Sequence, residues 1–369
     1  MSWLEPDAED RWSLRTARLK DGGWSDPVTV AQSVEKPFFV NWADFPSVRR
    51  VGEQRLVAHW LVRDGEGYAY SVRMAESRDE GRTWSEPWRP HEDASPTEHG
   101  FVSIVALGEG DAGLSWLDGR ALAAAAAAHG EGAHGSGDAS GDGSEGPKAF
   151  MQLRFRVWAG GGEALPEELV DGTVCDCCQP DMALAADGPV LAYRDRTADE
   201  VRDIYVARRV NGRWSEGVRV AEDGWVMPGC PVNGPAVDAR GQHVVVAWFT
   251  APEGERRVQV AFSSDGGASF GRALRVDGGV PLGRADVVLR EDGSALVGWM
   301  EREGESAVWR VRAVRPDGAM GEPVRAFTLD AGRGSGFPRM VPHGDAIVLA
   351  WTEPGRPGGI HMRRVAVEE

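Results

Sequence analysis

Long hydrophobic runs and a surplus of basic residues are both missing from this 369-residue sequence. No apolar run approaches the roughly 18 residues of a membrane-spanning helix, so we expect no transmembrane segment. The 57 Asp and Glu residues outnumber the 41 Lys and Arg residues, and the formal net charge is -16. Because phosphate backbones are bound by basic surfaces, a nucleic-acid partner is not expected.

Cysteine is scarce, and all four cysteines fall in two short segments. Cys175, Cys177 and Cys178 follow one another in Cys-Asp-Cys-Cys, and Cys230 stands in Pro-Gly-Cys-Pro. Such a concentration predicts that the fold brings both segments to one place. Two disulfides, a redox-active thiol and a metal site all remain open, and soft sulfur would favour Cu(I) or Zn(II) as the metal.

Glycine and tryptophan are abundant, with 48 and 15 residues, which favours many short strands joined by turns. Six alternating apolar segments end in an aromatic residue, mostly about 50 residues apart, and such a period is typical of propellers. The aromatic residues are Trp60, Trp116, Tyr193, Trp248, Trp299 and Trp351. The sequence therefore predicts an all-β, six-bladed propeller that forms one domain over residues 1–369.

The ends of the chain suggest how this ring closes. The last repeat ends near Val367 after three strands, and residues 24–30 resemble an isolated fourth strand. We expect these two parts to pair, because pairing would hide two open sheet edges.

Residues 121–148 are rich in Ala and then in Gly, Ser and Asp, and we predict that they form a flexible insertion. His129 and His134 within it are either solvated residues or metal ligands.

Two segments, residues 77–84 and 263–270, fit the pattern S-x-D-x-G-x-[TS]-[WF]. Asp can cap the backbone of a tight turn there, and Gly supplies its unusual dihedral angles. This pattern is the Asp-box, and the chain resembles the sialidase superfamily of six-bladed propellers. The resemblance implies an active site on the face where the first strand of each blade begins, away from the Asp-box turns.

The usual sialidase residues are incomplete. A Phe-Arg-Ile-Pro motif is absent from the first blade, where residues 44–48 read Asp-Phe-Pro-Ser-Val. None of the four tyrosines lies on the channel strand of a late blade, where the family places its nucleophile. These are Tyr68, Tyr70, Tyr193 and Tyr205. Hydrolysis of sialosides by the usual mechanism is therefore not expected.

A closer resemblance, to a bacterial group of sialidase-like propellers that share the cysteine motif, covers nearly the whole chain. It depends on residues 115–120, 174–179, 193–196, 202–204, 229–235 and 247–249. The resemblance implies an exported, often lipid-anchored protein, and we expect an extracytoplasmic location, periplasmic or beyond. Residues 1–7 lack the basic start and the apolar stretch of a secretory signal, so this chain is either a cytoplasmic protein or a mature or trimmed form. The resemblance favours the second interpretation.

Blade topology gathers candidate site residues near one face. The predicted ligand-binding residues are Arg120, Arg194, Arg196, Arg284, Arg339 and Asn233. The predicted acids or bases, if the protein is a hydrolase, are Asp118, Asp195, Glu301 and Glu353. The predicted metal ligands are Cys175, Cys177, Cys178, Cys230 and His99. The arginines have an alternative interpretation as ion pairs with nearby carboxylates.

Together these residues predict a sialidase-like exported propeller that binds a metal or a small anionic or glycan ligand at its channel mouth. Two alternatives stay open. One is a glycoside hydrolase of the exo-α-sialidase type. The other is an interaction propeller that the cysteines merely staple through disulfides. The oligomeric state is not predicted.

Overall fold

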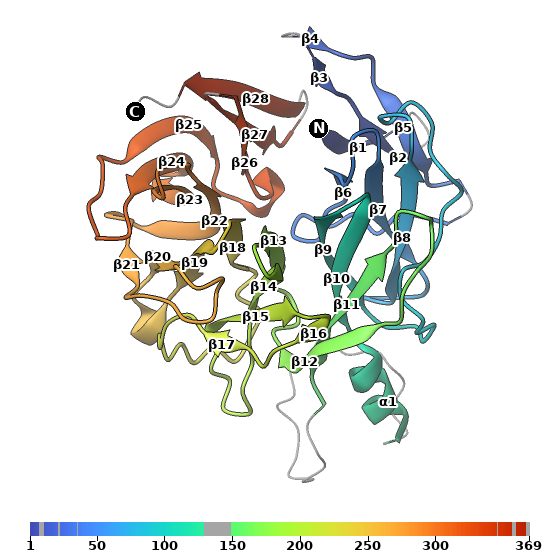
Figure 1. Ribbon diagram of the computed structural model, residues 1–369, viewed down its shortest axis with the longest axis horizontal. Helices are drawn as coiled ribbons and strands as arrows, with labels where there is room; N and C mark the ends of the chain where they lie inside the picture. Colours follow the sequence, from blue (N-terminus) through green and yellow to red (C-terminus); the bar gives the residue numbers. More distant parts are fainter. Residues whose placement is uncertain are drawn as a thin grey trace. The chain divides into compact units, whose positions relative to one another are not determined.

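Strands dominate the computed structural model, which describes residues 1–6, 11–20, 23–34, 36–128, 149–344, 346–355 and 359–366 (Figure 1). Strands contain 54% of the residues and helices contain 4%, so the prediction of an all-β propeller is confirmed. By its contacts the chain divides into two compact units, Met1–Asp176 and Cys177–Glu369. In the described part of the chain, no helix has the length and apolar character needed to cross a bilayer.

The first unit holds three antiparallel sheets of three or four strands. Their strands are β1 (Ser2–Pro6), β2 (Trp12–Thr16) and β5 (Val28–Gln32); β6 (Ser47–Arg50), β7 (Leu56–Arg63) and β8 (Tyr70–Ser77); and β9 (His99–Gly108), β10 (Asp111–Asp118), β11 (Met151–Trp158) and β12 (Glu168–Val174). A small hairpin of β3 (Leu19–Lys20) and β4 (Gly23–Trp24) and the helix α1 (Arg120–Ala128) complete the unit.

The second unit holds four antiparallel sheets. Their strands are β13 (Asp181–Ala185), β14 (Gly188–Arg194), β15 (Ile204–Val210), β16 (Arg213–Trp214) and β17 (Val218–Arg219); β18 (Ala236–Arg240), β19 (His243–Thr250), β20 (Arg257–Ser263) and β21 (Leu274–Arg275); β22 (Pro281–Leu289), β23 (Ala295–Glu303), β24 (Ser306–Val314) and β25 (Val324–Asp330); and β26 (Arg339–His343), β27 (Ala346–Glu353) and β28 (Gly359–Ala366). The short helices η1 (Pro252–Gly254) and η2 (Arg333–Ser335) lie in its loops.

The described sheets are seven blades, so the prediction of six is wrong. Six of them carry the expected aromatic residue near the end of their second strand. The sheet β1-β2-β5 was missed because its second strand begins with its tryptophan, Trp12, and does not end with one. Of its five residues only Ser13, Leu14 and Thr16 are buried, so this blade lacks the continuous apolar run of the others.

The predicted closure of the ring is also wrong within the described residues. Strand β5 pairs with β2, and β4 pairs with β3, whereas β28 pairs with β27. Pairing inside the N-terminal segment closes a short loop, and short loops cost less conformational entropy than a pairing between the two ends of the chain.

The Ala-rich start of the predicted insertion is helical. Residues 121–128 belong to α1, so they are helical within the segment for which the sequence predicted a flexible insertion. Alanine has the highest intrinsic helix propensity, and this run contains seven alanines and one leucine. The remainder of the prediction, residues 129–148 with His129 and His134, lies outside the described residues.

Successive blades of the second unit lie side by side and are joined by a repeated aspartate contact (Figure 1). In each case a carboxylate near the inner strand accepts a backbone N–H from the next blade. The bonds join Asp181 to Val237 N–H (3.0 Å), Asp238 to Leu289 N–H (2.8 Å) and Asp286 to Met340 N–H (2.6 Å). Apolar side chains between the sheets, with Trp248 and Trp299 fully buried, supply most of the packing.

The two S-x-D-x-G-x-[TS]-[WF] turns share one hydrogen-bond pattern. Asp79 accepts bonds from the N–H and the hydroxyl of Thr83, and Asp265 accepts the same two bonds from Ser269. These bonds favour the ionised carboxylate, and the pKa of both aspartates is lowered, that of Asp265 to about 2. The aspartates therefore hold their turns, as the sequence pattern predicts.

Candidate functional site

The clustered cysteines lie on one short turn, residues 175–178, which we call the cysteine turn. The sulfur atoms of Cys175, Cys177 and Cys178 all lie within 4.8 Å of one another. Cys175 and Cys178 are buried, and Cys177 is half-buried. A tetrahedral metal with bonds of about 2.3 Å to sulfur holds its thiolates about 3.8 Å apart. The three sulfurs can therefore close around one soft metal with small side-chain rotations.

The second cysteine segment passes close to the residue that follows this turn. A Cβ on Gly234 would lie 1.9 Å from the carbonyl oxygen of Gln179, so only glycine permits this approach. The two segments therefore meet at Gln179 and Gly234. Cys230 itself is exposed and is not among the three clustered sulfurs. Within the described residues, the sulfurs that lie together are thus those of Cys175, Cys177 and Cys178.

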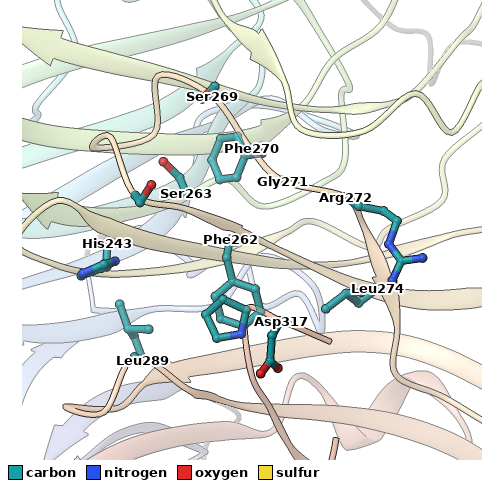
Figure 2. Close-up of a pocket in the computed structure, with 13 residues that line it drawn as sticks. His243, Phe262, Ser263, Ser269, Phe270, Gly271, Arg272, Leu274, Leu289 and Asp317 are labelled. Atoms are coloured by element: carbon teal, nitrogen blue, oxygen red, sulfur yellow. The ribbon is translucent and has the colours of Figure 1, made fainter. Parts of the chain in front are cut away.

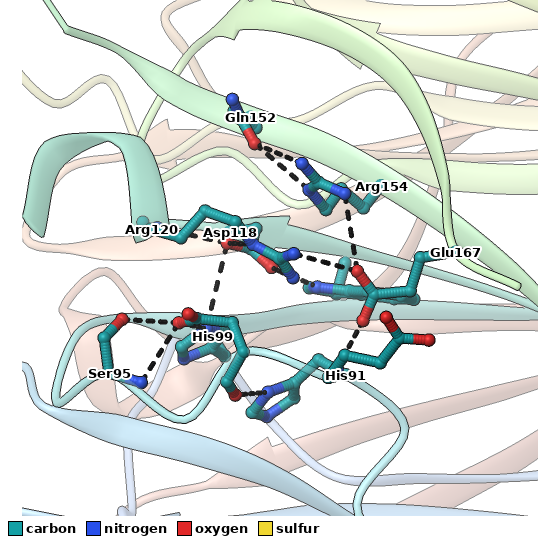
Figure 3. A network of polar contacts seen from close by, with 12 residues as sticks. His91, Ser95, His99, Asp118, Arg120, Gln152, Arg154 and Glu167 are labelled. Carbon is teal, nitrogen blue, oxygen red and sulfur yellow. Dashed lines mark hydrogen bonds and ion pairs between the residues drawn. The ribbon is translucent and has the colours of Figure 1, made fainter. Parts of the chain in front are cut away.

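His99 belongs to a different group, together with Asp93 and Asp118 (Figure 3). Its Nε2 atom lies 2.9 Å from Asp93 Oδ2 and 3.7 Å from Asp118 Oδ1. The ring stacks on that of His91, with the centroids 4.0 Å apart. Burial lowers the pKa of His91 to about 3, and its two ring nitrogens contact the Asp93 carbonyl oxygen and the Val72 N–H. His91 is therefore a neutral structural partner of His99.

Arg120, at the start of α1, neutralises Asp118 at the end of β10 (Figure 3). Its Nε and Nη2 atoms donate to the two carboxylate oxygens at 2.7 and 2.6 Å, and Trp116 Nε1 donates to Oδ2 at 2.8 Å. Burial acts to raise the pKa of Asp118, but these bonds outweigh it and the pKa lies below its ordinary value. Asp118 therefore stays ionised at neutral pH, which suits an anchor for Arg120 and does not suit a general acid.

Glu167 extends this network to a second arginine. It lies 2.9 Å from Arg120 Nη1 and 3.4 Å from Arg154 Nη1, while Arg154 also donates to Gln152 (Figure 3). The neighbouring acids raise the pKa of Arg120 above its ordinary value, although burial acts to lower it. A guanidinium bonded to both oxygens of Asp118 also opposes a cation there, so we propose no metal for the His99 group.

Arg194, at the end of β14, is a buried brace. Its guanidinium donates to the carbonyl oxygens of Asn233 at 2.8 and 3.1 Å, of Arg202 at 2.5 Å and of Phe249 at 2.6 Å. It also lies over the ring of Trp225, 4.9 Å from the centroid. With 1% of its surface exposed, Arg194 links several loops and has little access to a ligand.

Asn233 connects this brace to Arg284. Its Oδ1 atom accepts the backbone N–H of Arg284 at 2.7 Å, where the arginine has a φ of 53°. Such a backbone conformation is costly for a residue with a side chain and needs support from its surroundings. The Arg284 guanidinium donates to the carbonyl oxygens of Gly332 and Gly336, and burial lowers its pKa to about 10. Asn233 and Arg284 are thus built into the loop framework.

The remaining predicted ligand-binding arginines contact protein side chains. Arg196 Nη2 lies 2.8 Å from Glu200 Oε1. Arg339 Nη1 lies 3.6 Å from Asp286, and its Nη2 atom lies 3.4 Å from the Gln179 side chain. The ion-pair interpretation therefore describes the contacts of Arg120, Arg196 and Arg339, whereas the guanidinium groups of Arg194 and Arg284 donate to backbone carbonyl oxygens.

The other predicted carboxylates lie on three different sheets of the second unit. Asp195 is buried just beyond β14. Glu301, on β23, is 6% exposed and accepts bonds from Arg310 Nε at 2.6 Å and Trp299 Nε1 at 3.1 Å. Glu353, at the end of β27, is exposed and pairs with His361 at 2.8 Å. Glu301 and Glu353 are thus each held by side chains of their own sheets, and no two of the three form a carboxylate pair in the described contacts.

A buried cluster that the sequence reasoning missed surrounds Tyr70. Its hydroxyl lies 2.9 Å from Asp44 Oδ2 and 2.7 Å from Glu98 Oε1. Burial raises the pKa of Asp44 to about 7. Asp44 and Tyr70 are each 1% exposed, so the cluster is closed to a substrate. The sequence could have indicated this cluster, because Asp44 and Glu98 stand just before β6 and β9, which are the first strands of two successive blades.

No protein-family model matches the chain, and no curated protein matches it in sequence. Solved structures do match in three dimensions. A leech intramolecular trans-sialidase complexed with 2,7-anhydro-Neu5Ac is 10% identical, with a TM-score of 0.53 over 98% of this chain and 82% of that one. A Penicillium chrysogenum α-L-arabinanase complexed with arabinobiose is 13% identical, with a TM-score of 0.53 over 88% and 93%.

The NanB sialidase of Streptococcus pneumoniae is 12% identical, with a TM-score of 0.52 over 83% of this chain and 64% of that one. This chain therefore spans less than two thirds of that enzyme. Identities this low establish a shared fold and leave the reaction open. The chain has the β-propeller fold found in sialidases and related glycoside hydrolases.

Proposed function

We propose that this protein is an exported, sialidase-like propeller that binds one soft metal ion, Cu(I) or Zn(II), through Cys175, Cys177 and Cys178. The observation that carries the proposal is the closeness of the three sulfurs, all within 4.8 Å on one turn. Thiolates select soft metals over hard cations such as Mg²⁺ or Ca²⁺. The extracytoplasmic location is part of the proposal and comes from the family resemblance.

The local structure supports a fixed site. Strand β12 ends at Val174, which pairs with Met151 of β11, so one side of the cysteine turn is attached to a sheet. On the other side, Gln179 packs against Gly234. All three sulfurs belong to one four-residue turn, which limits how far they can separate, and a preformed ligand set lowers the entropy lost on binding. An exogenous ligand would supply the remaining coordination position, which is where a small anion would bind.

Metal analysis of the native full-length protein, together with a thiol count, tests this function. We expect about one copper or zinc per chain, loss of that metal in Cys177→Ser, and retention in Cys230→Ser. Cys177 is the half-buried member of the set, so its replacement disturbs the core least. Cys230→Ser is the matched control, because it removes a thiol outside the clustered three.

Three results would contradict the proposal. The first is native protein with neither metal nor titratable thiols, which would return the cysteines to a stapling role through disulfides. The second is metal that Cys177→Ser retains in full. A competition titration with a chromogenic Cu(I) chelator would measure the affinity of each variant, and binding that is equal in both variants would also refute the site.

A further inference from the structure

A hollow of about 490 Å³ lies between two blades of the second unit, at the end where the Asp265 turn stands (Figure 2). It is bounded by the sheet β18–β21 on one side and the sheet β22–β25 on the other. None of the predicted site residues lines it. Its volume falls in the range of small-molecule sites, roughly 300 to 1,000 Å³.

The floor of the hollow is apolar. Phe262 of β20 and Phe270 of the following hairpin are half-buried, and Leu274 and Leu289, which also line the hollow, are 8% and 4% exposed (Figure 2). Both phenylalanines pack by one side against the core clusters of their blades. The rings are therefore held in place, and their outer faces can receive a flat apolar surface.

The rim of the hollow is polar, and much of it is unused by the protein. Within the described residues, the side chains of Arg272, His243 and Ser264 make no hydrogen bond or ion pair. An arginine without a carboxylate partner is notable in a chain with 57 acidic and 41 basic residues. These groups therefore remain available to a ligand.

Asp317 supplies the acceptor on this rim. One of its oxygens, Oδ1, accepts the backbone N–H of Ala319 at 2.9 Å and fixes the turn after β24. Arg272 and Asp317 both line the hollow but form no ion pair with each other (Figure 2). The hollow thus combines apolar side chains with a charged donor, Arg272, and a charged acceptor, Asp317, that are not paired with each other.

We propose that this hollow is a carbohydrate-binding subsite that takes one pyranose unit of a glycan. A pyranose offers an apolar C–H face to Phe262 and Phe270. Its vicinal hydroxyl groups donate to Asp317 and accept from Arg272, and hydrogen bonds to charged groups are the stronger kind. The rim carries one cation and one anion, which favours a neutral polyhydroxylated ligand over a strongly charged one. The subsite is independent of the cysteine turn.

Saturation-transfer difference NMR on the full chain, followed by titration calorimetry, tests the subsite. The probes are the methyl pyranosides of glucose, galactose and mannose, with L-leucine as a zwitterionic comparison. We expect at least one pyranoside to bind. Asp317→Asn keeps the Oδ1 acceptor for the turn but weakens the hydroxyl contacts, and Arg272→Ala removes the donor. Each variant should weaken binding about 10-fold or more.

Three further variants keep the test decisive. Ser264→Trp places an indole in the hollow at an exposed position and should abolish binding. Arg213→Ala removes an exposed arginine from another blade, and Cys177→Ser removes the proposed metal ligand, and both should bind as the parent does. The proposal is overturned if no pyranoside binds, if L-leucine binds and the pyranosides do not, or if binding survives in Ser264→Trp.

Discussion

Arg120 in the first unit and Arg194 in the second were predicted to do the same thing, yet the structure uses them differently. Arg120 is paired with two carboxylates, and 22% of its side chain is exposed. Arg194 is 1% exposed and donates to backbone carbonyl oxygens from three residues. A cation balanced by acids belongs to an electrostatic network that responds to pH. A cation held by carbonyls belongs to the framework and should matter most for stability.

The sharpest test of this comparison is Arg194→Met. The substitution leaves the carbonyl oxygens of Asn233, Arg202 and Phe249 buried without their donor, and each unsatisfied group costs about 1–3 kcal/mol. We expect a loss of about 3–5 kcal/mol in the free energy of unfolding, measured by urea denaturation. Arg213→Ala, an exposed change in the same unit, should stay within about 0.5 kcal/mol. A loss below 1 kcal/mol in Arg194→Met would show that the brace is dispensable.

Arg120→Met should have the next largest effect, and it should depend on pH. The variant leaves Asp118, which is fully buried, without its guanidinium partner, and it retains the neutral donors Trp116 Nε1 at 2.8 Å and the backbone N–H of residue 120 at 3.1 Å. In the parent, the lowered pKa of Asp118 contributes stability that is present above about pH 4 and is lost as pH falls through the folded pKa. We expect a loss of about 2–3 kcal/mol at pH 7 that shrinks on acidification.

The double variant Arg120→Met, Asp118→Asn is the control for that experiment. Removing the buried charge together with its partner should recover part of the stability, because the cost arises from an unpaired carboxylate. Unfolding curves of the single and double variants at pH 7 and pH 4 measure this coupling. Equal stability of the two variants at pH 7 would indicate that Arg120 acts through packing alone.

The blades were predictable from sequence because their signal is local. Strands such as β19 and β23 are continuous runs of buried, mostly apolar residues that contain a tryptophan, and such runs recur along the chain. The blade of β1, β2 and β5 has short strands with few buried positions, so it carries no such pattern. The closeness of the three clustered sulfurs was also predictable, since a single turn contains them all.

The partners of the arginines were not predictable in the same way. Arg194 is held by the carbonyls of Asn233 and Phe249, which stand 39 and 55 positions away. Every residue carries a backbone carbonyl, so the residue types in the sequence do not indicate which carbonyl oxygens will accept hydrogen bonds from a given guanidinium. Tyr70 illustrates the same limit, because its neighbours Asp44 and Glu98 meet it only after three strands have folded.

The finest test compares two buried aspartates, Asp44 in the first unit and Asp286 in the second. Burial raises their pKa values to about 7 and about 6. The folded state then holds a proton that the unfolded state has released above about pH 4, so stability falls as pH rises from 4 to the folded pKa. Asp44→Asn removes this titration and retains an acceptor for the Phe101 N–H. Between pH 4 and pH 7 the unfolding free energy of this variant should therefore fall by about 1–2 kcal/mol less than that of the parent. In Asp286→Asn the same flattening should end near pH 6. If both variants keep the parental slope, the two carboxyl groups stay ionised in the folded protein, and burial does not raise their pKa values.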